Sequence, residues 1–201
     1  MSLITLNNRA LKNATAVGSI TGLGNLVFIS RSTASSSSSL SFTSGLTSTY
    51  KEYIFMFNNI HPASDGQQFL YNISADGGSN YNIAKQTTYF YVQYGEGGGS
   101  SNFGYDTGSD RTNDTGYARI GEAIGNDNDQ GGSGYLHIFD PSSTTFVKNF
   151  VSVFNVSTAE NNCLASYSGG YFNSTSAVNA IDFKCTSSNI DSGTIDMYGV
   201  L

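Results

Sequence analysis

Cys163 and Cys185 are the two residues whose spacing most directly suggests a covalent bond. Their midpoint falls in residues 173–175, Asn-Ser-Thr, a turn signal between two runs of strand-forming residues. A hairpin centred on that turn would place the two sulfur atoms on directly opposed residues, so a cross-strand disulfide is one hypothesis. The interpretation we favour is two small buried side chains, because free cysteine is commonly buried.

Residues 126–129, Asn-Asp-Asn-Asp, alternate amide and carboxylate side chains. Ca²⁺ takes about six to eight oxygen ligands of these types, so Asp127 and Asp129 are candidate calcium ligands. The run does not match an EF-hand loop, in which a glycine and a final glutamate occupy set positions. We therefore interpret it as a solvated turn and expect no bound metal.

No motif in the sequence indicates catalysis. The Gly-x-Ser-x-Gly nucleophile elbow, the His-Glu-x-x-His zinc motif and the phosphate-binding P-loop are all missing. His61 follows a predicted strand and His137 lies within one, where a histidine is usually packed or hydrogen-bonded. Among 15 acidic residues some pair suited to glycoside cleavage is nearly inevitable. We expect no enzymatic activity and no cofactor.

Residues 89–94, Tyr-Phe-Tyr-Val-Gln-Tyr, form an aromatic cluster. Aromatic faces stack on ligands or pack at subunit interfaces. The alternation of Tyr89 and Tyr91 with Phe90 and Val92 equally describes a strand between two layers. We favour the core or interface interpretation over a ligand platform.

The elements that position these residues are predicted strands. Ten runs rich in β-branched and aromatic residues are separated by Gly-, Asp- and Asn-rich turns. They cover residues 24–31, 50–58, 69–74, 86–94, 117–124, 134–140, 145–155, 163–172, 177–184 and 193–200. Because no helical pattern alternates with them, the runs predict an antiparallel all-β sandwich or barrel. Leu40 and Phe42 alternate with polar neighbours and predict a further, exposed strand at the end of a serine-rich stretch.

Composition narrows the classes of protein. The 201 residues include only 9 basic and 15 acidic ones, for a net charge of −6, but 13 Tyr and 13 Phe. Abundant aromatics with little charge exclude a disordered chain, and the acidic balance disfavours a nucleic-acid partner. No run approaches the roughly 18 apolar residues of a membrane span, and no signal-peptide pattern is present. We therefore expect synthesis in a cytoplasm without membrane insertion.

Seven short segments carry a family resemblance. They are residues 33–44, 49–53, 55–62, 74–81, 125–129, 139–145 and 193–199. Together they resemble the small virion structural proteins of marine tailed bacteriophages. The resemblance covers roughly residues 24–201 and implies a β-sandwich component of a particle, which forms oligomers.

On this resemblance we expect a β-sandwich of jelly-roll type at residues 24–201 and an N-terminal arm at residues 1–23 that docks onto other virion proteins. The expected function is a tail-associated structural protein, a short fibre or its receptor-facing tip, assembled as a homotrimer by analogy with phage appendages. Tyr94, Tyr105 and Tyr117 are then candidate contacts to a host surface glycan or protein. The alternative is a capsid decoration protein that stabilises the head shell.

Overall fold

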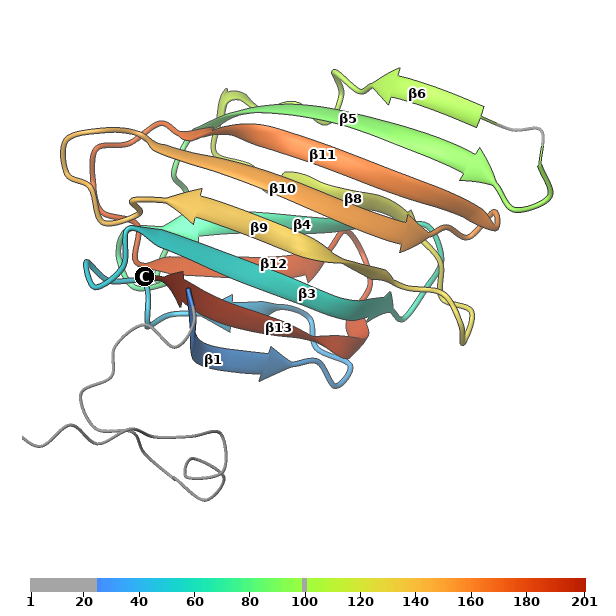
Figure 1. The fold of residues 1–201 in the computed structure, drawn as a ribbon, viewed down its shortest axis with the longest axis horizontal. Coiled ribbons are helices and arrows are strands. Elements are labelled where there is room, and N and C mark those ends of the chain that lie inside the picture. Colours follow the sequence, from blue (N-terminus) through green and yellow to red (C-terminus); the bar gives the residue numbers. More distant parts are fainter. Residues whose placement is uncertain (1–24, 99–100) are drawn as a thin grey trace, which may run out of the picture.

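The computed structural model describes residues 25–98 and 101–201, which form thirteen β-strands (Figure 1). Within those ranges no helix is long and apolar enough to cross a membrane. The strands are β1 (Leu26–Thr33), β2 (Leu40–Phe42), β3 (Glu52–Pro62), β4 (Gln67–Ser74), β5 (Lys85–Gly95), β6 (Ser101–Tyr105), β7 (Thr112–Asp114), β8 (Ala118–Ile124), β9 (Gly132–Phe139), β10 (Lys148–Ser157), β11 (Asn162–Phe172), β12 (Ala180–Cys185) and β13 (Ile190–Val200).

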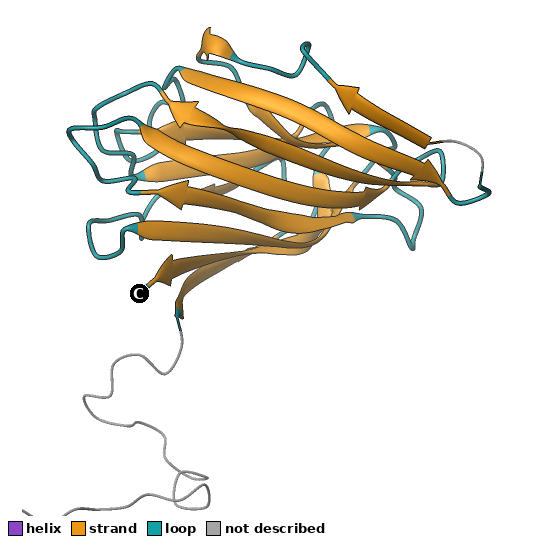
Figure 2. Cartoon of the chain, turned by 45° about the horizontal axis from the view of Figure 1, so that its top comes forward, coloured by secondary structure: helices purple, strands orange, loops and turns teal. Residues whose placement is uncertain are grey.

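The strands form two antiparallel sheets that lie one over the other (Figures 1 and 2). The larger sheet has nine strands in the order β1-β13-β3-β9-β10-β11-β5-β6, with β7 paired to β5 off this path. The smaller sheet has four strands in the order β2-β12-β4-β8. The prediction of an antiparallel all-β fold is confirmed.

The hydrophobic core fills the space between the sheets, because each strand turns alternate side chains toward it. On β3 the inward side chains are Tyr53, Phe55 and Phe57, all buried. Phe183 of β12 meets them from the smaller sheet, with its ring centroid 5.3 Å from that of Phe57 and 5.5 Å from that of Phe55. Aromatic rings from both sheets therefore supply the bulk that separates the layers.

All ten predicted strands are present, with ends shifted by a few residues. The strand at Leu40–Phe42 is also present as β2, but both of these side chains are buried against the core, so the expectation of an exposed strand is wrong. Strands β6 and β7 were not predicted, because their side chains are largely exposed and their short sequences lack a run of apolar residues. The predicted N-terminal arm, residues 1–23, lies outside the described residues.

The prediction of a hairpin centred on residues 173–175 is wrong. Strand β11, which carries Cys163, pairs with β10 and β5, whereas β12, which carries Cys185, pairs with β2 and β4. The chain crosses from the larger sheet to the smaller one between these strands, so each covers the core from a different side. Both cysteines are free; Cys163 is exposed and Cys185 is buried. The register that suggested a disulfide therefore does not exist.

Candidate functional site

The outer side of the larger sheet carries a group of exposed apolar residues, which we call the aromatic face. The register places its members on one side, since Phe90 lies opposite both Tyr105 and Tyr167, and Val92 lies opposite Phe103. Some of their chain neighbours, such as Tyr89, Leu136 and Phe150, lie on the opposite side of the sheet and are buried in the core. The aromatic face consists of Phe90, Val92, Tyr94, Phe103, Tyr105, Tyr135, Val151 and Tyr167.

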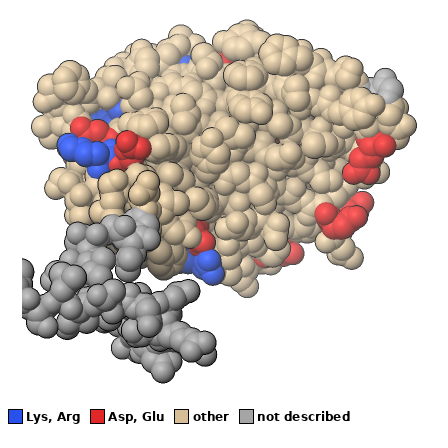
Figure 3. Space-filling model, viewed as in Figure 1, with Lys and Arg blue, Asp and Glu red and all other residues tan. Residues whose placement is uncertain are grey.

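The aromatic face contains no charged side chain. In β5, β6, β9, β10 and β11 the only Lys, Arg, Asp or Glu residues are Lys85 and Lys148, and both are buried on the inner side. Figure 3 shows the middle of this face free of charge, with charged side chains gathered at its margins. The rings of Phe90 and Tyr167 stack at 5.1 Å, and that of Phe103 lies 5.9 Å from Phe90. The rings thus form a continuous platform.

The three tyrosines singled out in the sequence do not meet at one site. Tyr94 and Tyr105 belong to the aromatic face, with 57% and 56% of their surface exposed. Tyr117 precedes β8 of the smaller sheet, and its hydroxyl donates a hydrogen bond to Asp182 at 2.8 Å. Burial, and then this hydrogen bond, raise the pKa of Tyr117. Tyr117 is therefore hydrogen-bonded to a strand of the smaller sheet and is not part of the aromatic face.

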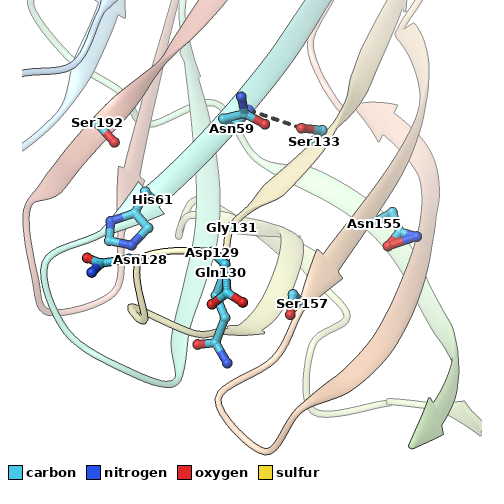
Figure 4. Close-up of a pocket in the computed structure, with 10 residues that line it drawn as sticks. All are labelled: Asn59, His61, Asn128, Asp129, Gln130, Gly131, Ser133, Asn155, Ser157 and Ser192. Atoms are coloured by element: carbon cyan, nitrogen blue, oxygen red, sulfur yellow. Dashed lines mark hydrogen bonds between the residues drawn. The ribbon is translucent and has the colours of Figure 1, made fainter. Parts of the chain in front are cut away.

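A second candidate site is a hollow at one end of the larger sheet, which we call the end pocket (Figure 4). Its volume is about 490 Å³, within the range of about 300–1,000 Å³ typical of small-molecule sites. Its walls come from β3, from the loop before β9 with the start of β9, from the end of β10 and from β13. Ten residues line it, and seven of them are neutral amides or hydroxyls; the other three are His61, Gly131 and Asp129, the one carboxylate among them.

Irregular strand pairing creates the end pocket. The register of β3 against β9 shifts between Phe57 and Ile60, and that of β3 against β13 shifts on both sides of Ser192. Between these shifts Asn59 adopts a left-handed backbone, with φ of 49°, and its backbone N–H donates to Ser133 Oγ at 3.0 Å. Bulges re-aim side chains next to binding sites, and left-handed residues other than glycine cluster at such sites. The pocket occupies the space that these bulges leave between the strands.

The two aspartates proposed as calcium ligands lie in or beside this pocket. Asp129 lines it, whereas Asp127 uses its backbone: its carbonyl oxygen is 3.2 Å from His61 Nε2, and its N–H donates to Gln130 Oε1. Across residues 25–98 and 101–201, no three or more His, Cys, Asp or Glu side chains gather as a metal site would require. The geometry of the described residues thus offers no calcium cage.

The end pocket was missed in the sequence because its walls come from segments far apart along the chain. Asn59 and Ser192, for example, are brought together only by the pairing of β3 with β13. Two local signals were nevertheless present: the Asn58-Asn59 pair, suited to a left-handed residue, and the Gly131-Gly132 pair at the start of β9. Neither signal by itself specifies a partner.

Fold and surfaces together define an all-β protein of two antiparallel sheets with an uncharged aromatic face and a neutral, polar end pocket. Comparison of the chain with protein-family models, with curated proteins and with solved structures finds no match.

Proposed function

We propose that the protein is a structural subunit of a bacteriophage virion, associated with the tail as a short fibre or its receptor-facing tip. The observation that carries the proposal is the aromatic face. A monomer rarely exposes a large contiguous apolar patch, and such patches mark interaction sites. A subunit that works among identical neighbours gains by burying this face.

The partner that fits the aromatic face is a second copy of the chain. Each copy carries a net charge of −6, so most other contacts between copies would bring like charges together, whereas this face brings none. The five strands that carry the aromatic face lie about 4.8 Å apart and are on average about 30 Å long, so the outer surface they form, polar side chains included, measures roughly 700 Å². That area is close to the roughly 800 Å² that each partner buries in a stable complex. A homotrimer, by analogy with phage appendages, is the arrangement we favour; around its three-fold axis the aromatic face of each copy would contact a different surface of the next copy, because contact between two identical surfaces gives a dimer.

The order of strands supports a jelly-roll description of the fold. Four antiparallel pairs nest within the chain: β1 with β13, β2 with β12, β3 with β9 and β4 with β8. Alternate pairs fall in opposite sheets, as β1-β13-β3-β9 and β2-β12-β4-β8. We take this nesting as the wrapping of eight strands into two Greek keys. Strands β5–β7 and β10–β11 are then insertions that widen the larger sheet and supply most of the aromatic face.

The remaining parts of the proposal concern partners beyond the chain itself. Residues 1–23 would attach the subunit to other virion proteins, and Tyr94 and Tyr105 would face either a neighbouring copy or the host surface. The alternative function is a capsid decoration protein, which would bury the same aromatic face against the head shell. No catalytic activity, cofactor, nucleic acid or membrane insertion forms part of either function.

The test of self-association places a charge on the aromatic face. Val151→Glu and Phe103→Glu each bury a carboxylate if two copies meet there, and each should weaken association at least about tenfold. Phe146→Glu is the matched control, because Phe146 is 70% exposed in the loop before β10 and is not one of the residues that form the aromatic face. Mass measured by light scattering should show an oligomer for the wild type and the control, and a monomer for the two face variants. A monomeric wild type would refute the proposal of self-association.

Copy number distinguishes the two functions. Quantitative mass spectrometry of purified particles should find few copies relative to the major head protein if the subunit belongs to the tail. Copies in proportion to the head protein would instead favour decoration, and antibody labelling confined to the head would rule out the tail-associated function.

A further inference from the structure

We propose that the end pocket binds a neutral saccharide. The biological role of this binding rests on the receptor-facing function proposed above. The binding itself follows from the pocket alone.

The pocket is lined by polar side chains that make no hydrogen bond within the described part of the protein. The side chains of Asn59, Asn128, Asp129, Ser157 and Ser192 line it, and none of them makes a hydrogen bond to another described residue. They come from β3, from the loop before β9, from β10 and from β13, so the fold brings them together from four segments. Figure 4 shows these side chains arranged around one hollow.

Other pocket residues serve as a scaffold. Gln130 accepts a hydrogen bond from Asp127 N–H and donates to Thr158 O and Asn161 Oδ1, both at 3.0 Å. These bonds tie the loop before β9 to the turn after β10. His61 Nε2 lies 3.2 Å from the carbonyl oxygen of Asp127, and its Nδ1 is buried with no hydrogen-bond partner in the described part of the chain. The loop that carries Asn128 and Asp129 is therefore held in place from both sides.

The chemistry of the unused groups defines the ligand. An amide offers one acceptor and two N–H donors, and a hydroxyl offers both functions, so the ligand must also carry donors and acceptors side by side. Vicinal hydroxyls of a sugar ring meet this requirement. None of the ten described residues that line the pocket is a Lys or Arg that could neutralise an anion, and Asp129 would repel one. A single carboxylate is too little for a bare cation, and the polar walls give no burial to an apolar ligand.

The binding expected of one pocket is weak. Hydrogen bonds exchanged with water contribute only about 0.5–1.5 kcal/mol each, and among the described residues no Phe or Tyr ring lines the pocket for a sugar to stack on. A dissociation constant in the millimolar range is therefore expected for a monosaccharide. Several pockets presented by one oligomer would raise the avidity without any new contact.

The experiment is a titration followed by ¹H–¹⁵N NMR chemical shifts, using the full chain. The probes are methyl α-D-glucopyranoside, methyl α-D-galactopyranoside and N-acetyl-D-glucosamine, with D-glucuronate as the charged comparison. At least one neutral probe should shift the signals of residues around the pocket, and D-glucuronate should bind at least about tenfold more weakly because of Asp129.

The variant Asn128→Ala/Ser192→Ala should raise the dissociation constant at least about tenfold, since it removes two hydrogen-bonding groups. The control is Asn149→Ala/Ser38→Ala, which removes the same two side-chain types from exposed positions outside the pocket.

Failure of all three neutral probes at tens of millimolar, or wild-type affinity in the pocket variant, would overturn the inference. A monomeric or head-located protein that still binds a neutral sugar would defeat the proposed function and leave this inference standing.

Discussion

At the scale of single residues, the two cysteines differ in reactivity because their surroundings differ. The thiolate is the reactive form of cysteine. Burial raises the pKa of Cys185 to about 12, whereas Cys163 is exposed. We predict that a maleimide or disulfide reagent labels one thiol in the native protein and the second only after unfolding. Cys163→Ser should abolish the fast reaction and Cys185→Ser should preserve it. Two thiols that appear only after chemical reduction would contradict this prediction.

Lys85 is a buried cation whose ionisation should affect stability. Its ammonium group is fully buried and donates to Asn72 Oδ1 and to the carbonyl oxygen of Gly116, both at 2.8 Å. Burial lowers its pKa from 10.5 to about 8. Between these two values the unfolded chain binds more protons than the folded one, so the free energy of unfolding rises with pH. The cost of the buried charge is fully present below pH 8.

We predict that deprotonation of Lys85 raises the free energy of unfolding by about 1 kcal/mol between pH 7.5 and pH 9. Urea unfolding at the two pH values should show a smaller rise for Lys85→Met than for the wild type. Lys51→Met is the control, since Lys51 is largely exposed and its removal should leave the rise unchanged. Burial also shifts the pKa values of Lys148, Cys185, Tyr71 and Tyr89, but these residues are common to all three proteins. The same rise in wild type and Lys85→Met would contradict the assignment.

At the scale of elements, close approach of backbones constrains the larger sheet. A Cβ added at Gly134 of β9 would overlap the main chain of β10 at Val153 and Phe154. Gly134→Ala should therefore force β9 and β10 apart and cost about 1–3 kcal/mol of unfolding free energy. Gly97 is the matched control, because a Cβ there meets nothing within 4 Å. Denaturant titration of both variants tests this; a wild-type midpoint for Gly134→Ala would show that the sheet adapts without strain.

Strand existence was predictable because period-two alternation is a local property of the chain. The run containing Tyr53, Phe55 and Phe57 shows it plainly, and β3 lies there. Exposure was less predictable, as the buried Leu40 and Phe42 show, because it depends on which layer covers a strand. β6 carries the exposed Phe103 and has no inward apolar row, so its sequence offered no signal.

At the scale of the whole molecule, Phe183 links the two sheets. Its ring contacts Phe42 and Phe69 in its own sheet and Phe55 and Phe57 in the other. Phe183→Ala should lower the free energy of unfolding by about 3–5 kcal/mol, because it leaves a cavity between the layers.

The control for this change is Phe146→Ala, which removes an equal side chain from the surface and should stay within about 0.5 kcal/mol of the wild type. Equilibrium unfolding followed by tyrosine fluorescence gives both values. An effect of Phe183→Ala as small as that of the control would mean that the sheets are held together elsewhere.

The sequence by itself determined the strand content, the position of most turns and the scarcity of charge, since each follows from neighbouring residues. Only the tertiary structure decided which strands pair, because pairing depends on contacts between residues far apart along the chain. That decision separated Cys163 from Cys185 and placed Tyr94 and Tyr105, but not Tyr117, on the aromatic face. It also brought four segments around the end pocket, where bulges that no local pattern predicts leave polar side chains with no hydrogen-bond partner among residues 25–98 and 101–201.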